Sequence, residues 1–461
     1  MERRPPFRSD LTGLTWPALF KGQAAQLAAT LYQLEDSQWW TPEELARAQQ
    51  GQLRVLLGHI LKNVPYYRKA YRELGRPEAL IEGWAEIPVL SRSDVQEAGK
   101  ALFSTAMPKE HGPAQAVLTS GSTGRPVEAL STAVTRFFWN ACTVREHLWH
   151  GRDFKGKLAA IRPDRKTIPG GSVSPSWGPP VDLLFKTGPS ALLHSNTPID
   201  AQLDWLREQN PAYLLSLPTN LQALAEMCRE KSIVLPALRE VRSYGETVRP
   251  KLRKLVREVW DVPVTDVYTT QEVGNLALQC PESGEYHLQA EHLLVEIVDE
   301  NGQVCGPGEI GRVLVTTLHN LASPLIRYEI GDHAEVGEPC VCGRGLPVIR
   351  RVLGRERNLV VLPNGRRHWP SFPEEDWMAA APIQQLQLVQ KTTERIEARV
   401  AAPRKLTAKE EGRLSEIFAE SLGHAFTFEY VYVDEIPRGP NGKFEDFVSE
   451  ISTTARSEEQ A

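Results

Sequence analysis

The chain has 461 residues, 41% hydrophobic and 24% charged, so a packed core is easily supplied and a wholly disordered chain is not expected. Its 53 Lys and Arg against 58 Asp and Glu give a formal net charge of -5, which offers no general electrostatic case for a nucleic-acid partner. The first residues lack the apolar core of a signal peptide, and no apolar run reaches the roughly 18 residues of a membrane span. We therefore expect no membrane partner and a cytoplasmic location.

The first hundred residues have the pattern of amphipathic helices. In the segment 41–64 apolar residues recur every three or four positions, which is the spacing of one helix face. Thr41 followed by Glu44 is the pattern of a capping box, in which each side chain accepts a hydrogen bond from the backbone of the other residue. The sequence therefore predicts a core helix that begins after Thr41.

The segment Leu118–Pro126 reads LTSGSTGRP and is rich in glycine and hydroxyl residues. Glycine lets a backbone approach a ligand closely, and hydroxyl groups donate hydrogen bonds to anionic oxygens. The pattern favours a phosphate-binding loop between two strands, although Ser/Gly-rich runs also form plain flexible turns. The P-loop of nucleoside triphosphatases is excluded, because Gly124 is followed by Arg-Pro where that motif needs Lys-Ser/Thr and a helix.

From residue 212 onward, strand-like and helix-like segments alternate. The expected strands are 212–217, 238–244 and 264–270. We expect a helix capped by Thr219 after the first strand, and a helix with Pro250 at its first position after the second. Strands joined by helical crossovers form a parallel sheet, and ligands bind beyond the carboxyl ends of its strands. The polar loops YGET (244–247) and YTTQE (268–272) therefore belong to one edge of this sheet.

Residues 281–350 are rich in β-branched and turn residues, which predicts antiparallel hairpins, one of them around Asn301-Gly302. Four residues of metal-ligand type lie in this segment or just before it, as a Cys-x6-His pair and a Cys-x-Cys pair: Cys280, His287, Cys340 and Cys342. Together they would complete a tetrahedral zinc site that is structural, because four protein ligands close the shell. The alternative is three unrelated thiols and a surface histidine. The six cysteines do not suggest a disulfide framework.

The composition changes again after residue 354. The segments RIEARVAA, AKEEGRLSEIFAESLG and FTFEYVYVDEI predict a small α/β unit of strand, helix and strand. A Gly/Pro-rich loop that presents Lys443 follows, and we expect a short helix after it. We therefore predict two domains, 1–354 and 355–461.

Six ordered motifs between residues 55 and 450 resemble those of the acyl-adenylate-forming superfamily, which includes acyl-CoA synthetases, firefly-type luciferases and peptide-synthetase adenylation domains. They are TSGSTGRP (119–126), SYGE (243–246), VYTTQEVG (267–274), IRYEIGD (326–332), GRERN (354–358) and PRGPNGKF (437–444). Within that superfamily, LLGHILKNVPYYRKAY (56–71), CVCGRGLP (340–347) and GKFEDFVSEI (442–451) look most like phenylacetate-coenzyme A ligases and related capsular-polysaccharide-biosynthesis-type proteins. The zinc-type Cys/His arrangement is also similar to the one in members of that branch.

The resemblance implies an α/β fold: a large N-terminal AMP-binding domain with parallel and mixed sheets, and a small mobile C-terminal α/β domain that carries the catalytic lysine loop. By the same resemblance, Lys443 and Glu272 are catalytic, with Glu272 holding Mg²⁺, Asp332 accepting the ribose hydroxyls and Tyr268 stacking on adenine. The residues that the resemblance assigns to ATP and AMP are Thr119, Ser120, Gly121, Ser122, Thr123, Gly124, Gly245, Glu246, Tyr268, Thr269, Thr270, Asp332 and Arg355. Thr269 and Gln271 depart from the family pattern, which usually has Gly and a hydroxyl residue there.

The reaction implied by the resemblance joins a carboxylic acid to ATP, releases pyrophosphate, and passes the acyl group from acyl-AMP to the thiol of CoA. An aryl or short acyl acid is favoured by the aromatic pocket candidates, which are Phe138, Trp139, Tyr244 and the turn at Pro218. Two alternatives stay open: an adenylating enzyme that delivers the acyl group to an amine, a hydroxyl or a carrier-protein thiol, and a catalytically silent binding protein. A homodimer is compatible with the sequence.

Overall fold

The computed structural model describes residues 7–73, 75–118, 127–163, 168, 170–355, 359–368, 377, 379–437 and 447–451. The chain divides into two compact units, Met1–Val352 and Leu353–Ala461. The predicted domain boundary at residue 354 stays a prediction.

The N-terminal part of the large unit is helical. It contains helices α1 (Gly22–Ser37), α2 (Pro42–Asn63), α3 (Pro65–Ala70), α4 (Pro77–Glu82) and α5 (Arg92–Ala98). The predicted capping box at the start of α2 is present, because Thr41 accepts from the Glu44 N–H and Glu44 accepts from the Thr41 N–H. The apolar face of α2 packs into a core that includes Leu56, Leu57 and Tyr67. Burial of these side chains anchors the helical region to the rest of the unit.

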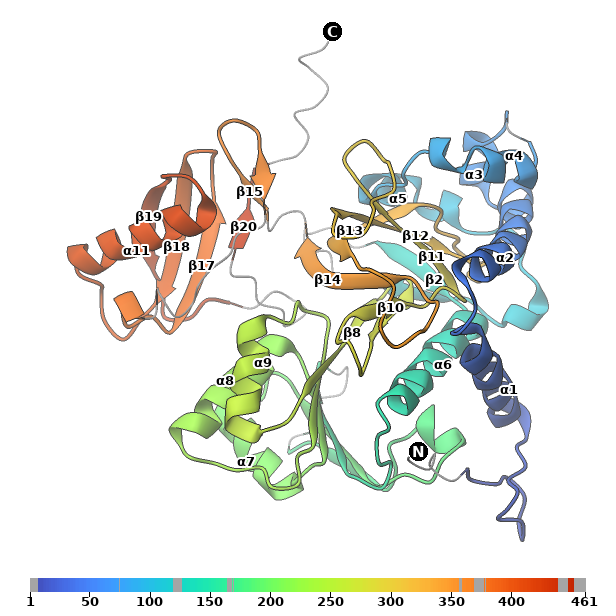
Figure 1. Ribbon diagram of the computed structural model, residues 1–461, viewed down its shortest axis with the longest axis horizontal. Helices are drawn as coiled ribbons and strands as arrows, with labels where there is room; N and C mark the ends of the chain where they lie inside the picture. The colour runs from blue at the N-terminus through green and yellow to red at the C-terminus, as the bar shows by residue number, and fades with distance from the viewer. Residues whose placement is uncertain are drawn as a thin grey trace. The chain divides into compact units, whose positions relative to one another are not determined.

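A mixed sheet forms the centre of the large unit, and its strand order in the described chain is β11-β12-β13-β14-β10-β9-β8-β7-β6-β3-β5-β4 (Figure 1). The strands of its parallel part are β3 (Leu158–Arg162), β5 (Ser190–His194), β6 (Tyr213–Ser216), β7 (Glu240–Tyr244) and β8 (Val264–Thr270). The antiparallel strands are β4 (Ser172–Ser174), β9 (Gly274–Gln279), β10 (Tyr286–Leu288), β11 (Leu293–Val298), β12 (Ile310–Thr317), β13 (Tyr328–Val336) and β14 (Val348–Arg355). The predicted fold class is confirmed.

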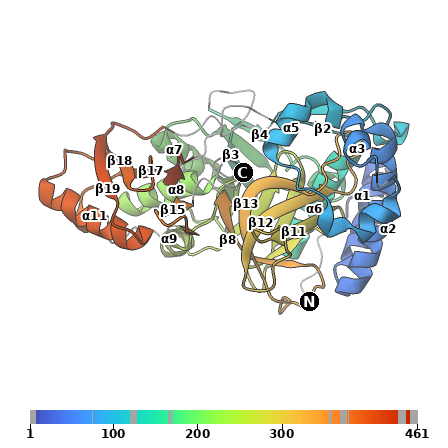
Figure 2. The same cartoon turned by 90° about the horizontal axis from the view of Figure 1, so that it is seen from above.

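The crossover helices of the parallel strands are α7 (Ile199–Gln209), α8 (Pro218–Glu230) and α9 (Pro250–Trp260). Helices α8 and α9 lie side by side (Figures 1 and 2). They bury their apolar faces against the strands in a core that includes Leu214, Leu221 and Val256. Pro250 occupies the first position of α9, as predicted, where its missing N–H costs no helix hydrogen bond.

Strands β1 (Gln115–Leu118) and β2 (Glu128–Ser131) form a separate antiparallel pair. Helix α6 (Ala133–Trp149) follows β2 directly, and Thr132 caps it by accepting from the Thr135 N–H. Helix α1 packs along α6 (Figure 1). The start of α6 is thus fixed next to β2.

The small unit contains a four-stranded sheet in the order β19-β18-β17-β20, and helix α11 (Ala408–Leu422) shares a core with it. Its strands are β17 (Gln385–Gln390), β18 (Arg395–Ala401), β19 (Thr427–Tyr432) and β20 (Phe447–Ser449), and a two-stranded sheet pairs β15 (Val360–Val361) with β16 (Arg367–His368). The predicted short helix after the lysine loop is wrong in the described residues, because Phe447–Ser449 is strand β20. It pairs in parallel with β17, and Phe447 is buried in the core. These contacts with distant residues stabilise the strand, and the local sequence does not show them.

Among the described residues, no helix combines the length and the apolar character that a bilayer crossing requires.

Candidate functional site

The predicted edge of the parallel sheet is present. Strands β7 and β8 are parallel neighbours with Tyr244 opposite Val267, so the loops that follow them leave the sheet at the same edge. Burial raises the pKa of Tyr244 to about 12, which keeps its phenol protonated. Strand β8 ends at Thr270, whose Oγ1 is buried without a hydrogen-bond partner among the described residues. This hydroxyl keeps its capacity to donate to, or accept from, a bound ligand.

Tyr268 and Asp332 meet although 64 residues separate them. The Tyr268 hydroxyl donates to Asp332 Oδ2 at 2.8 Å, and the tyrosine is 8% exposed. Tyr268 belongs to β8 and Asp332 to β13, so this bond joins the parallel and antiparallel parts of the sheet. Thr269 lies beside them, at the irregularity in the pairing of β8 with β9. The structure therefore brings two of the predicted nucleotide residues together, while their roles stay predictions.

The loop after β7 is held by its glutamate. Glu246 accepts from the Thr219 N–H at 2.9 Å and from Thr219 Oγ1 at 3.2 Å. Thr219 is therefore not the helix cap that the sequence predicts, because α8 begins one residue earlier, at Pro218, and Leu217 is the residue before it. A carboxylate at a helix N-terminus satisfies a free N–H group and favours the helix dipole. The carboxylate of Glu246 thus fixes the loop that contains Gly245.

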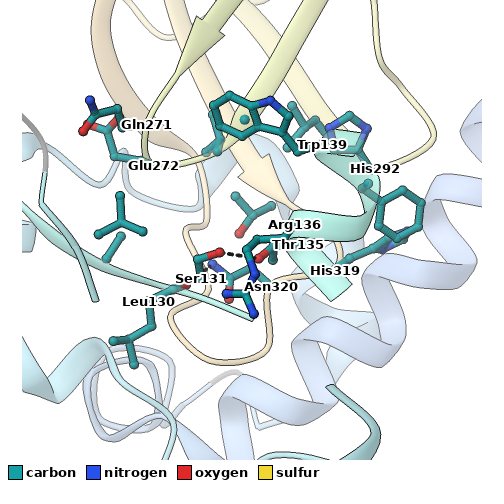
Figure 3. A pocket seen from close by; sticks show the side chains of 17 residues that line it. Leu130, Ser131, Thr135, Arg136, Trp139, Gln271, Glu272, His292, His319 and Asn320 are labelled. Atoms are coloured by element: carbon teal, nitrogen blue, oxygen red, sulfur yellow. Dashed lines mark hydrogen bonds between the residues drawn. The ribbon is translucent and has the colours of Figure 1, made fainter. Parts of the chain in front are cut away.

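A pocket lies between α6, β2, the β8–β9 turn and the segment after β12 (Figure 3). The side chains that define it are Ser131, Thr135, Arg136, Phe138, Trp139, Gln271, Glu272, His292, His319 and Asn320. Of the predicted site residues, Phe138, Trp139 and Glu272 line this pocket. Tyr244 and the buried Pro218 do not.

Aromatic rings form one wall of the pocket. Phe138 stacks on His292 with centroids 5.7 Å apart, and its ring lies 4.3 Å from that of His319. Burial lowers the pKa of His292 to about 3 and that of His319 to about 4, so both imidazoles are neutral at pH 7. Trp139 lies over Gly274, where a Cβ would come within 3.1 Å of the indole. Glycine at this position leaves room for the tryptophan.

The four predicted metal ligands converge. The ligand atoms of Cys280, His287, Cys340 and Cys342 all lie within 4.8 Å of one another. The Sγ atoms of Cys280 and Cys340 are 3.8 Å apart, which matches the edge of about 3.8 Å in a tetrahedron with Zn–S bonds of about 2.3 Å. His287 Nε2 lies 3.2 Å from Cys342 Sγ, while Nδ1 donates to the Leu346 carbonyl at 3.3 Å. This second bond orients the ring with Nε2 toward the thiols, so the donor set fits a tetrahedral metal ion.

Some predicted residues are not covered by the structure. Lys443 and the phosphate-loop residues Thr119, Ser120, Gly121, Ser122, Thr123 and Gly124 lie outside the described residues. Arg355 ends strand β14, and its side chain lies outside the described set.

A buried group of charges was missed by the sequence analysis. Arg152 donates to Glu146 at 2.5 and 2.7 Å and to Glu240 at 2.6 and 2.8 Å, and Arg242 donates to Glu146 at 2.6 Å. Burial opposes ionisation of Glu146, but the two arginines hold its pKa well below the usual value. The group joins the end of α6 to β7. Arg136 was also missed, because a single arginine on a helix carries no motif.

The fold is shared with solved acyl-CoA ligases. A structure of 2-hydroxyisobutyryl-CoA ligase in the postadenylation state, in complex with 2-HIB-AMP, matches 90% of this chain and 91% of that chain with a TM-score of 0.69 at 19% identity. The anthranilate CoA ligase in complex with anthranoyl-AMP matches 71% of this chain and 65% of that chain with a TM-score of 0.53 at 16% identity. The chain has the acyl-adenylate-forming fold. The family resemblance on which the sequence prediction rests is thereby confirmed at the level of fold.

Sequence comparisons agree with the adenylate-forming fold. The phenylacetate-coenzyme A ligase of Thermus thermophilus is 26% identical over 339 residues, which cover 69% of this chain and 72% of that protein. The protein of the same name from Pseudomonas putida is 23% identical over 344 residues, 72% of this chain and 75% of that protein. Residues 377–450 match the family model of the CapK C-terminal domain. The capsular-type match lies in the small unit, and the alignments with the ligases are longer than that unit and so extend into the large one.

Proposed function

We propose that the protein adenylates a carboxylic acid with Mg·ATP and transfers the acyl group to CoA. In the first step an oxygen of the acid attacks the α-phosphorus of ATP, and pyrophosphate leaves to give acyl-AMP. In the second step the CoA thiolate attacks the acyl carbonyl and AMP leaves. The observation that carries the proposal is the meeting of Tyr268 and Asp332 beside the carboxyl end of β8, within a fold shared with ligases solved with acyl-AMP.

The proposed roles follow from charge. A carboxylate and a triphosphate repel each other, so adenylation requires cations near the developing negative charge. Glu272 is an anion at the pocket wall and is the proposed ligand of Mg²⁺, which neutralises phosphate oxygens when bound. Lys443 is the proposed second cation, for the bridging and carboxylate oxygens. Asp332 is the proposed partner of the ribose hydroxyls, with Tyr268 orienting it through its hydroxyl.

The proposed acid is aryl or short. Phe138, Trp139 and the neutral His319 give the pocket a flat apolar wall, which suits a planar ring. Relatives named phenylacetate-coenzyme A ligase and a fold neighbour solved with anthranoyl-AMP support an aryl acid. The proposed location is the cytoplasm, because none of the six cysteines forms a disulfide bond.

We propose zinc as the ion held by Cys280, His287, Cys340 and Cys342. The four ligands leave no open position, so the ion would act in structure and not in catalysis. The cluster joins the turn after β9, strand β10 and the loop before β14. Its contribution is to hold these segments together.

A competing proposal is that the acyl group is transferred to an acceptor other than CoA. The segment LPNGRRHWPSF (362–372) differs from the loop that shapes the thiol tunnel in the family, and this favours an amine, a hydroxyl or a carrier-protein thiol as the acceptor. A homodimer stays compatible with either acceptor.

The experiment that tests the function measures pyrophosphate release with Mg·ATP over a panel of aryl, short-chain and amino acids, with and without CoA. Acid-dependent release that accelerates with CoA supports the ligase. Acid-dependent release that ignores CoA keeps adenylation and rejects CoA as the acceptor. ATP–pyrophosphate exchange that fails with every acid would favour the silent binding protein.

A further inference from the structure

Two opposite charges line the pocket without pairing. Arg136 and Glu272 both contribute to its wall, and within the described part of the chain neither is recorded in an ion pair. Figure 3 shows Glu272 and Arg136 entering from different sides. The pocket imidazoles of His292 and His319 are neutral, so they neither add to the charge of Arg136 nor replace it. Each of the two charges is therefore available to a bound ligand.

The donors of Arg136 are mostly unused. A guanidinium has five N–H donors, and the hydrogen bond recorded for Arg136 in the described chain is from Nη1 to the neutral Gln115 Oε1 at 3.2 Å. Gln115 belongs to β1 and so holds the arginine at the start of α6 without neutralising it. An arginine in a pocket with an unused donor fork matches the geometry of carboxylate and phosphate oxygens.

The neighbouring polar groups are already satisfied. Thr135 Oγ1 accepts from the Thr132 N–H and lies 3.0 Å from Ser131 Oγ. Asn320 donates to the Leu130 carbonyl, and its Oδ1 accepts from two backbone N–H groups. These residues shape the wall around Arg136 but have little hydrogen-bonding capacity left for a ligand. Among the described lining residues, Arg136 is the one that offers a positive charge to an anion.

We propose that Arg136 binds an oxyanion of a reactant in this pocket, on a different side from Glu272, the proposed Mg²⁺ ligand. Two sources of that oxyanion share the chemistry: a phosphate of ATP or pyrophosphate, and a second carboxylate at the far end of the acid. The inference rests on the proposed function, because it takes the ligands of the pocket to be those of adenylation. It adds a specificity-determining residue to that function.

The test measures binding by calorimetry on the full chain, with inorganic pyrophosphate in the presence of Mg²⁺ as one probe and terephthalate, an aryl dicarboxylate, as the other. In Arg136→Gln we expect at least one probe to bind about tenfold more weakly or worse, because a charge-assisted hydrogen bond is lost. In Arg136→Lys, which keeps the charge, the loss is smaller. Arg54→Gln, on the exposed side of α2, is the matched control and should bind as the wild type does.

The outcomes separate the sources and the hypotheses. Weaker pyrophosphate binding alone assigns Arg136 to the phosphate chain, and weaker terephthalate binding alone assigns it to the distal end of the acid. If both weaken, competition between the probes shows that they share the guanidinium. The proposal is overturned if neither probe binds the wild type, or if Arg136→Gln with an unchanged circular dichroism spectrum binds both as tightly. Because no turnover is measured, absence of adenylation does not decide this result.

Discussion

The two ends of helix α6 carry charges in opposite states. At its C-terminal end Glu146 is buried and paired with two arginines, Arg152 and Arg242. At its N-terminal end Arg136 lines a pocket with Glu272, and the two do not form an ion pair in the described chain. Buried charges that satisfy one another support the structure, whereas charges that face a pocket unpaired are free to act on a ligand. The difference separates what α6 does for the fold from what it does for the site.

Breaking the paired end should have the largest effect. Glu146→Ala leaves Arg152 and Arg242 buried without their shared carboxylate, and we expect it to lower the free energy of unfolding by about 3–5 kcal/mol. Urea unfolding followed by tryptophan fluorescence measures this loss. Glu146→Gln, which keeps the shape, serves if the alanine variant does not fold.

The control for this change is Glu208→Ala, on the exposed surface of α7, which should stay within about 0.5 kcal/mol of the wild type. Equal free energies of unfolding for Glu146→Ala and the wild type would contradict the claim that the ion pairs of Glu146 stabilise the fold.

Removing the pocket anion should affect chemistry and not stability. In Glu272→Gln we expect acid-dependent pyrophosphate release to fall about 100-fold, because the proposed Mg²⁺ ligand is lost, with the free energy of unfolding within about 0.5 kcal/mol of the wild type. Steady-state assays at several Mg²⁺ concentrations measure the rate of pyrophosphate release, and urea unfolding measures the free energy of unfolding. Glu282→Gln on the exposed turn after β9 is the control. Full activity in Glu272→Gln would contradict the role.

The Cys/His cluster, like the buried charges around Glu146, is a group of side chains proposed to stabilise the structure. Cys340→Ser should reduce bound zinc from about one ion per chain toward none and lower the melting temperature by a few degrees, because the segments around β10 lose their tie. Elemental analysis and differential scanning calorimetry measure these changes. Cys228→Ser, in the core of α8, is a matched thiol change away from the cluster and should keep the metal. A wild type without zinc would reject the proposed ion.

A smaller effect concerns the neutral pocket histidines. The pKa of His319 is lowered by burial to about 4 in the folded protein, against about 6.5 when unfolded. Below pH 6.5 the unfolded chain therefore binds a proton that the folded chain does not, and the free energy of unfolding falls as the pH falls toward 4. In His319→Gln this slope should be smaller by up to about 1.4 kcal/mol per pH unit. Denaturation at pH 7.5, 6, 5 and 4 measures it, and identical slopes would contradict a neutral His319.

Local signals predicted much of the fold. Thr41 with Glu44 and the proline at position 250 marked helix starts that the structure contains, because caps and first-turn prolines act within one turn. The predicted strand 264–270 is β8. Two predictions were wrong at positions where contacts with a distant segment determine the local structure. Phe447–Ser449 becomes a strand by pairing with β17, and α8 receives its acceptor from Glu246, 27 residues away.

The parts of the site that the sequence predicted are those marked by a motif, by ligand spacing or by the aromatic residues Phe138 and Trp139 at the start of α6. The ordered motifs pointed to Tyr268 and Asp332, and the Cys-x6-His and Cys-x-Cys spacing pointed to the four Cys/His residues; the structure brings each of these sets together. No motif marks Arg136 in the sequence. Its proposed role depends on the pocket around it and on the absence of a carboxylate partner among the described residues. Such a property exists only in three dimensions.

The most direct test of the central claim is ATP–pyrophosphate exchange with labelled pyrophosphate, measured without CoA across the acid panel. The account predicts exchange that requires an acid, because adenylation is reversible before any acceptor acts. Absence of exchange with every acid, under conditions where the folded protein binds Mg·ATP, would contradict the claim that the chain forms an acyl-adenylate.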